Sequence, residues 1–245
     1  MREIDLIAGK NPVLEALRAG RPINKILLAK GTETNQEIIN IATAKGIPIQ
    51  WVERQLIEQK IETKAHQGVL AMASPIGYVD IDDILEIAKK RQEDPFLLLL
   101  DHLEDPHNLG AILRTAEAAG VHGVIIPKRR GVSVNSTVAK TSAGAVEYVP
   151  IARVANLVQT MEKLKQAGCW IVGTDQDAQE DHYKADLKGP LVVVVGSEGK
   201  GIGRLVKENC DFTVRIPMTG KLNSLNASVA ASIIMYEVYR QRGQA

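Results

Sequence analysis

The sequence is poor in residues that cross-link small proteins through disulfides or metal ions. It has only two cysteines, Cys169 and Cys210, and they fit no metal-binding spacing. No cluster of histidine, cysteine and aspartate has ligand spacing either. A disulfide is not expected in a chain with the composition of a cytosolic protein. We therefore expect no metal site and a fold that depends on its hydrophobic core.

Long hydrophobic runs are also absent. The longest apolar stretches have the length of a β-strand, and the first five residues are too charged for a signal peptide. These features predict a cytoplasmic protein that does not span a membrane.

Neither strong net charge nor a high aromatic content marks a nucleic-acid partner. The net charge is +1, and aromatic residues are 4% of the chain. An RNA-binding surface would therefore come from local basic patches, such as Lys128, Arg129 and Arg130. We expect it to use shape and phosphate contacts more than base stacking.

Hydrophobic side chains make up 45% of the 245 residues, enough to bury a full core in one or two domains. Strand and helix patterns alternate along both halves, which predicts an α/β fold with a mostly parallel sheet in the second half. Ser74 and Pro75 interrupt the first series, and Pro95 begins the second. We predict one domain at residues 1–74, a connector at 75–93 and a second domain at 94–245.

The individual elements follow from hydrophobic periodicity and from glycine and proline signals. Asn11 is the expected N-cap of a first helix that has Pro12 at its first position and ends before Gly20. Strands are predicted at residues 23–29, 47–52, 68–73, 96–100, 122–127, 169–174, 191–195 and 212–216. Further helices are predicted at residues 35–45, 53–63, 81–91, 108–119, 135–143, 154–167 and 225–242.

Three segments of the second domain share one design: an apolar strand, a polar or glycine-rich loop, and a helix start. They span residues 100–114, 195–203 and 216–228. Because open α/β sheets bind ligands at the carboxyl ends of their strands, we expect the active site here. The glycine-rich loop after residue 195 matches neither the Walker pattern nor the dinucleotide fingerprint, and Glu198 would repel a phosphate.

These segments contain three motifs. They are DPHNLGAILRTA at residues 105–116, VGSEG at 195–199 with a further glycine at Gly203, and IPM at 216–218 followed by SLNASVA at 224–230. In this order they resemble the SpoU family of S-adenosylmethionine-dependent RNA 2′-O-ribose methyltransferases, within the knotted SPOUT superfamily.

The start of the chain adds a second resemblance. GKNPVLEAL at residues 9–17 is similar to the start of a small ribosomal-protein-like α/β/α domain. That domain binds RNA in family members that modify large-subunit rRNA, and the bacterial enzymes acting on a guanosine of 23S rRNA are the most similar. The resemblance implies an S-adenosylmethionine donor, an rRNA partner, a C-terminal trefoil knot and a homodimer formed by the methyltransferase domain.

By resemblance, the donor pocket contains Gly196, Ile216 and Leu225. Glycine permits close approach of the backbone to a ligand. From the sequence alone, packing in the core is the simpler explanation of Ile216 and Leu225.

The family's catalytic positions correspond to Asn108, Arg114, Glu198, Ser224 and Asn226. Ser224 and Asn226 stand at a helix start, where capping is the commonest use of such residues, and Asn108 has the same ambiguity.

In the family, Arg114 is the proposed proton acceptor. A guanidinium is a poor base, so clamping the phosphate beside the target ribose is the easier role. We leave the neighbouring His107 out of the catalytic set.

Three other functions remain open from the sequence. A tRNA ribose 2′-O-methyltransferase would usually lack the first domain. A catalytically inactive RNA-binding protein of the same fold would not need the catalytic residues, which are intact here. An unrelated nucleotide-binding α/β protein would explain the glycine-rich loop but not the other two motifs.

Overall fold

The computed structural model describes residues 4–31, 36–61, 66–220 and 224–243, and its chain divides into two compact units. Unit 1 contains the residues up to Gly77 together with Val134–Tyr148. Unit 2 contains Tyr78–Ser133 and the residues from Val149 onward. The polypeptide therefore passes from one unit to the other three times.

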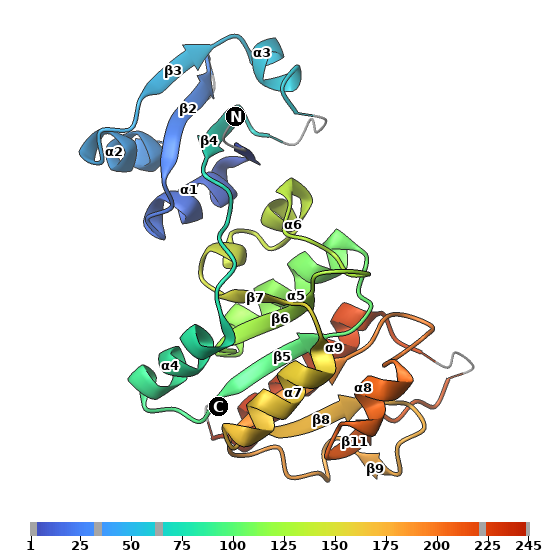
Figure 1. Ribbon diagram of the computed structural model, residues 1–245. Coiled ribbons are helices and arrows are strands. Elements are labelled where there is room, and N and C mark those ends of the chain that lie inside the picture. The colour runs from blue at the N-terminus through green and yellow to red at the C-terminus, as the bar shows by residue number, and fades with distance from the viewer. Residues whose placement is uncertain (1–3, 32–35, 62–65, 221–223, 244–245) are drawn as a thin grey trace. The chain divides into compact units, whose positions relative to one another are not determined.

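Unit 1 is built on a four-stranded sheet with the order β1-β4-β2-β3 (Figure 1). Strand β4 pairs antiparallel with β1 and β2, whereas β2 and β3 are parallel. The elements are β1 (Asp5–Ala8), α1 (Lys10–Arg18), β2 (Ile23–Ala29), α2 (Gln36–Ala44), β3 (Ile49–Val52), α3 (Arg54–Glu58) and β4 (Val69–Ala73).

Each face of this sheet has its own hydrophobic core. On one face, residues of α1 and α2 such as Leu17 and Ile38 pack with Ile26 of β2. On the other, Ile57 of α3 packs with Leu27. The alternation of Ile26 and Leu27 between the two faces is that of a buried strand.

The predicted N-cap of α1 is wrong. Asn11 lies inside the helix, and the N-cap is Gly9, whose backbone has a φ of 106° and a ψ of 156°. The N–H of Gly9 donates to the carbonyl oxygen of Val69 at 3.0 Å, so β4 holds the chain at this point. Glycine adopts this conformation at little cost, and the helix begins immediately after it. The predicted end is right, because Gly20 follows with a φ of 76°.

Residues 134–148 lie between two strands of the second half in sequence, yet they pack in unit 1. They form α6 (Ser136–Thr141) and a 3₁₀ turn, η1 (Ala145–Glu147). The guanidinium of Arg21 bonds the Glu147 carboxylate at 2.8 Å and Asp5 at 2.5 Å, and the first two side chains are each only 6% exposed. Burial raises the pKa of Glu147, although Arg21 opposes this shift.

Unit 2 has a seven-stranded sheet with the order β7-β6-β5-β10-β8-β11-β9, and all of its pairings are parallel. Its strands are β5 (Phe96–Leu100), β6 (Gly123–Pro127), β7 (Ile151–Val154), β8 (Trp170–Thr174), β9 (Glu180–Asp181), β10 (Leu191–Val195) and β11 (Phe212–Arg215). Its helices are α4 (Ile81–Arg91), α5 (Pro106–Ala118), α7 (Leu157–Gln166), α8 (Arg204–Glu208) and α9 (Ala227–Gln241). The α/β fold and the parallel sheet are as predicted.

Helices cover both faces of this sheet (Figure 1). Helices α4, α7 and α8 share one hydrophobic core with the strands, which includes Ile84, Leu164 and Val206. Helices α5 and α9 lie on the opposite face, where the hydroxyls of Thr115 and Ser232 are 3.1 Å apart. The predicted connector is thus largely a helix, α4, that packs on the sheet; the predicted domain boundaries stay a prediction.

Other predicted bounds differ by more than two residues. Helix α3 ends at Glu58, shorter than the predicted 53–63, of which residues 62 and 63 lie outside the described part. Helix α7 begins at Leu157 because residues 151–154 form β7, a strand that was not predicted. The side chain of Asn156 caps α7 by accepting the N–H of Gln159 at 3.2 Å.

Candidate functional site

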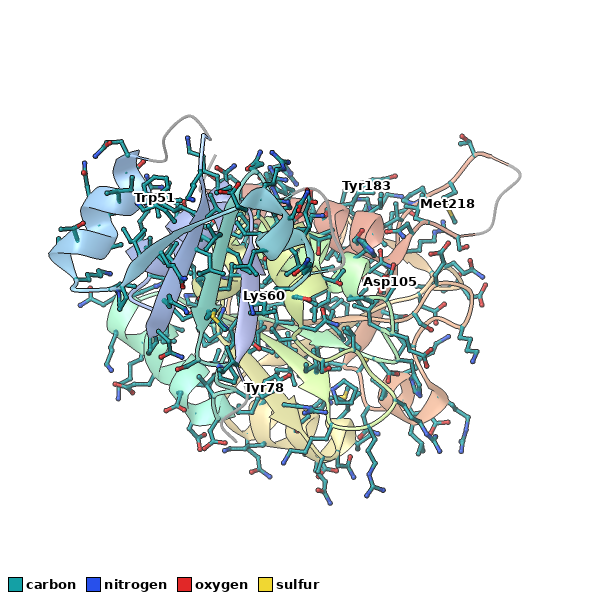
Figure 2. The ribbon with its side chains drawn as sticks, turned by 90° about the horizontal axis from the view of Figure 1, so that it is seen from above. Trp51, Lys60, Tyr78, Asp105, Tyr183 and Met218 are labelled. Atoms are coloured by element: carbon teal, nitrogen blue, oxygen red, sulfur yellow. The ribbon has the colours of Figure 1, made fainter. Side chains whose placement is uncertain are left out.

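A cleft of about 510 Å³ opens at the carboxyl ends of β8, β10 and β11. It is lined by the three loops that follow these strands and by the first turn of α9. Met218, labelled in Figure 2, lies at the base of the loop after β11. The carboxyl edge of a parallel sheet is the general ligand site of such folds. Two of the three predicted segments, 195–203 and 216–228, line the cleft, whereas residues 100–114 are not in its described lining and the loop after β8, which was not predicted, is.

The wall formed by the loop after β10 depends on a glycine. A Cβ at Gly196 would lie 2.1 Å from the backbone carbon of Gly201, far inside van der Waals contact. Ser197 and Gly201 exchange two backbone hydrogen bonds, of 3.2 and 2.9 Å, which close the loop on itself. Because the loop folds back over residue 196, only glycine fits there.

The same loop is tied to β5 by Asp101, a residue that was not among the sequence candidates. Its carboxylate is buried and accepts the N–H of Gly203 at 2.8 Å. Its second oxygen lies 2.6 Å from Nδ1 of His102. The sequence contains no signal for this contact, since 102 residues separate its two partners.

Asn226 makes hydrogen bonds of two kinds, one through its side-chain oxygen and one through its amide nitrogen. Its side-chain oxygen accepts the N–H of Ser228 at 2.9 Å and caps α9. Its amide nitrogen donates to a carboxylate oxygen of Glu198 at 3.4 Å. The capping interpretation is therefore right, and the same side chain also joins the loops after β10 and β11.

Three other candidates line the cleft. They are Ile216, Ser224 and Leu225. Ile216 and Leu225 are half-buried, and Ser224 is exposed. Core packing alone does not account for the two apolar residues, because part of each side chain faces the open cleft.

Asn108 and Arg114 lie on α5 and are absent from the described lining of the cleft. Asp105, rather than Asn108, caps α5, by accepting the N–H of His107 at 2.9 Å. Capping is thus excluded as the role of Asn108. Arg114 is exposed, and within the described part of the chain no ion pair or hydrogen bond engages its guanidinium.

The charges around the cleft were also not predicted. Asp175 and Asp177 follow β8, and Asp175 forms an ion pair with Lys207 of α8. Burial opposes the ionisation of Asp175, but hydrogen bonds from Lys207 and from the Asp177 N–H outweigh it and lower its pKa. Asp175 is therefore anionic and already neutralised by Lys207, which leaves Asp177 and Glu198 as the acceptors open to a cationic ligand.

The basic triplet follows β6 at the same edge of the sheet. Lys128, Arg129 and Arg130 are all exposed. In the strand order, β5 lies between β6 and β10. The loop after β5, which leads into α5, therefore follows the strand between those of the basic triplet and the glycine-rich loop.

The described residues contain no group of three or more histidine, cysteine, aspartate or glutamate side chains that could hold a metal ion. Cys169 and Cys210 are unpaired, and burial raises the pKa of both thiols, that of Cys210 to about 12. Among the described helices, none has the length and apolar character needed to cross a membrane.

Two family models match the chain. The model of the SpoU rRNA Methylase family matches residues 95–236. The model described as RNA 2′-O ribose methyltransferase substrate binding matches residues 6–79. The first covers the cleft, the basic triplet and α5, and the second covers most of unit 1.

Relatives and solved structures match over nearly the whole chain. A Bacillus subtilis protein, whose name places it in the TrmH family of tRNA/rRNA methyltransferases, is 51% identical over 97% of this chain and 96% of its own. The SpoU methyltransferase AviRb of Streptomyces viridochromogenes, solved with AdoMet, has a TM-score of 0.83 and 27% identity, over 99% of this chain and 92% of its own. The TrmH/SpoU tRNA modifying enzyme of A. aeolicus has a TM-score of 0.56 and 32% identity, and covers only 66% of this chain and 82% of its own.

Proposed function

Since the chain belongs to the SpoU rRNA Methylase family, we propose that it transfers a methyl group from S-adenosylmethionine to the ribose 2′-hydroxyl of a guanosine in 23S rRNA. The observation that carries this proposal is the cleft at the carboxyl ends of β8, β10 and β11, next to a basic loop at the same edge. The cleft provides space for the donor and the loop provides charge for the RNA.

The residues of the cleft fit this donor. A volume of about 510 Å³ suits a ligand of its size. Gly196 lets the backbone approach the ligand closely, and Ile216 and Leu225 offer apolar contacts to an adenine ring. Glu198 and Asp177 supply negative charge toward a sulfonium. When bound, S-adenosylmethionine would supply an electrophilic methyl group: the ribose oxygen bonds to the methyl carbon as the carbon–sulfur bond breaks, and S-adenosylhomocysteine is the leaving group.

The protein's own part in the reaction is to align the ribose. Positioning of reactants can lower a barrier by several kcal/mol. Asn226 holds Glu198 at one side of the cleft. We assign contact with the ribose to Asn108, near the start of α5. Arg114, whose planar fork of N–H donors matches the oxygens of a phosphate, clamps the phosphate beside the target ribose. Ser224 contributes a hydroxyl at the mouth of the cleft.

The chain is proposed to act as a cytoplasmic homodimer with a C-terminal trefoil knot. One side of α9 supports the dimer: Val229 is 47% exposed and Tyr236 51% exposed, and the half-buried Ile233 lies between them. At this spacing the three side chains share one face of the helix. Exposed apolar residues in a row are typical of a surface that pairs with another subunit.

Coverage by the comparisons favours rRNA over tRNA as the substrate. The tRNA modifying enzyme of A. aeolicus aligns with only 66% of this chain, whereas a structure described as an rRNA methyltransferase of Sinorhizobium meliloti aligns with 97% of it. This chain has a substrate-binding domain at residues 6–79, and an enzyme that modifies tRNA can lack such a domain. A tRNA ribose methyltransferase and an inactive RNA-binding protein remain the alternatives for the test below.

The test is methyl transfer from labelled S-adenosylmethionine to unmodified 23S rRNA, 16S rRNA and bulk tRNA, followed by mapping of the ribose that resists alkaline cleavage. Label at one 23S guanosine is expected. Label on tRNA alone would show that the substrate is tRNA and not 23S rRNA. Donor binding without transfer to any RNA would favour a catalytically inactive RNA-binding protein. If Arg114→Ala and Asn226→Ala both keep wild-type turnover, the site assignment is wrong.

A further inference from the structure

We propose that Asp101 is a positioning residue of the donor cleft: its buried carboxylate fixes the glycine-rich loop, residues 196–203, in the shape that accepts the donor. This inference rests on the proposed function, because it assigns the cleft to S-adenosylmethionine. Asp101 itself is not part of the described lining, so it acts through the loop.

Asp101 bonds both ends of the glycine-rich loop. Its backbone N–H donates to the carbonyl oxygen of Val195, the last residue before the loop, at 2.9 Å. Its carboxylate accepts the N–H of Gly203, the last residue of the loop and the N-cap of α8, at 2.8 Å. The residue that immediately follows β5 therefore sets the distance between the two ends.

The glycine-rich loop needs such an external restraint. It contains glycine at positions 196, 199, 201 and 203, and glycine loses more conformational entropy on ordering than any other residue. The paired backbone bonds of Ser197 and Gly201 close its middle but not its ends. Without the Asp101 carboxylate, Gly203, the N-cap of α8, would lose its hydrogen bond to the residue that follows β5.

The site is built closely around this carboxylate. Asp101 is 2% exposed, so water does not compete for its oxygens. A Cβ at Gly203 would lie 3.1 Å from the carboxylate oxygen, which is tighter than an ordinary contact. A charged acceptor in a dry setting forms a strong hydrogen bond, and its loss is correspondingly costly.

His102 offers a competing interpretation, because an Asp–His pair is a common general base. Its ring lies against Gly203, and the described lining of the cleft does not include it. Its backbone has a φ of 56°, a conformation that glycine adopts more easily than histidine. His102→Gly is therefore expected to fold, and to keep both donor affinity and turnover.

The experiment compares Asp101→Ala with Asp211→Ala as a matched control. Asp211 also accepts a backbone N–H, that of Ile171 at 2.8 Å, but at the start of β8, the opposite end from the cleft. Both variants lose one carboxylate–amide bond in the same sheet. We would measure S-adenosylmethionine affinity by calorimetry, and KM for the donor and kcat with 23S rRNA.

Asp101→Ala is expected to weaken donor binding and raise the donor KM about tenfold, the order of one hydrogen bond to a charged group. Asp211→Ala is expected to leave both unchanged. Asp101→Asn keeps an oxygen for the Gly203 N–H and is expected to restore most of the affinity, which also covers the case that the alanine variant does not fold.

Two outcomes would overturn the inference. Donor affinity in both Asp101 variants equal to that of wild type would make Asp101 a purely structural residue. Loss of turnover in His102→Gly with donor affinity intact would make Asp101 the partner of a base. A wild-type protein that binds no S-adenosylmethionine would instead contradict the proposed function.

Discussion

Gly196 is the residue on which the shape of the cleft depends most directly. In Gly196→Ala the new methyl carbon would meet the backbone of Gly201 at 2.1 Å, so the loop must open. Overpacking of this kind costs about 1–3 kcal/mol. We expect a folded protein whose affinity for S-adenosylmethionine, measured by calorimetry, falls at least about tenfold.

The matched control is Gly77→Ala. No heavy atom lies within 4 Å of the added carbon there, and the backbone φ is not positive. It tests the general effect of replacing glycine by alanine, and its donor affinity should equal that of wild type. If wild type, Gly196→Ala and Gly77→Ala bind S-adenosylmethionine with equal affinity, the glycine-rich loop is not part of the donor site.

Asn226 allows its two roles to be separated by substitution. Asn226→Asp keeps a good N-cap for α9 but places a carboxylate opposite Glu198, where the amide donor was. We expect the midpoint of thermal unfolding to change little and kcat with RNA to fall at least about tenfold. Asn226→Ala should lose both the cap, about 1 kcal/mol, and activity. Full activity in Asn226→Asp would reduce Asn226 to a helix cap.

For single residues, the sequence predicts well those roles that depend on neighbouring residues in the chain. The asparagine cap at position 226 follows from the sequence around it, and the assignment of Gly196 to the donor pocket follows from the resemblance of its loop to a family motif. Asp101 and Asp175 do not, because their partners, Gly203 and Lys207, are distant in sequence and come close only through the order of β5, β10 and β8 in the sheet. A carboxylate that follows a strand can bind many kinds of partner, and only the folded structure shows which partner lies beside it.

At the scale of elements, His122 joins the start of β5 to the segment before it. Nδ1 accepts the N–H of Phe96 at 3.0 Å, and Nε2 lies 2.9 Å from Glu93. Because Nδ1 is an acceptor, the ring is neutral and donates from Nε2. Burial lowers the pKa of His122 below 6.5, and Glu93 only partly opposes this.

A lowered histidine pKa makes stability depend on pH in a defined direction. The folded protein binds fewer protons at His122 than the unfolded chain, so this contribution is complete above pH 6.5 and is lost as pH falls below it. The slope is at most about 1.4 kcal/mol per pH unit. We expect urea unfolding at pH 7.5, 6.5 and 5.5 to show wild type approaching His122→Gln in stability as the pH falls. A difference in unfolding free energy between wild type and His122→Gln that stays constant with pH would contradict this account. His107→Gln, which replaces an exposed histidine, serves as control.

The elements themselves were mostly predictable, and their errors have tertiary causes. Strands β2, β5 and β10 and helix α4 have the predicted bounds because their apolar patterns end at clear breaks. The start of α1 was missed because the bond of Gly9 to Val69 overrides the cap signal of Asn11. Strand β7 was missed because residues 151–154 continue into a helical pattern.

At the scale of the whole molecule, the dimer proposed through α9 can be tested on a single side chain. Tyr236→Arg would place a charge in the apolar row of Val229 and Ile233. Burying an unpaired charge at an interface costs several kcal/mol. We expect sedimentation equilibrium to show a dimer for wild type and a monomer for Tyr236→Arg at micromolar concentration.

Tyr183→Arg is the matched control for this experiment. Tyr183 is as exposed as Tyr236, at 51%, and it lies outside α9. It should remain dimeric. A monomeric wild type, or dissociation of both variants, would contradict α9 as the interface.

The sequence predicts the two-part organisation but not where residues 134–148 pack. They follow β6 in a region with the pattern of the methyltransferase domain, and the ion pair of Glu147 with Arg21 spans 126 residues. No local signal distinguishes a glutamate that will be buried against a distant arginine from one that faces water. The predicted knot, likewise, depends on the path of the whole chain.

The three passages of the chain between the units affect how deletion experiments are interpreted. A fragment that begins at residue 78 would retain residues 134–148 but lose Arg21, β1 and α1, the elements that α6 and the 3₁₀ turn η1 contact. A truncated protein that failed to methylate RNA would therefore not demonstrate that the deleted residues touch RNA. The same loss of activity would result if residues 134–148 unfolded because the residues of unit 1 that they pack against had been removed. Point substitutions on the surface of unit 1, rather than its removal, are the way to locate the RNA.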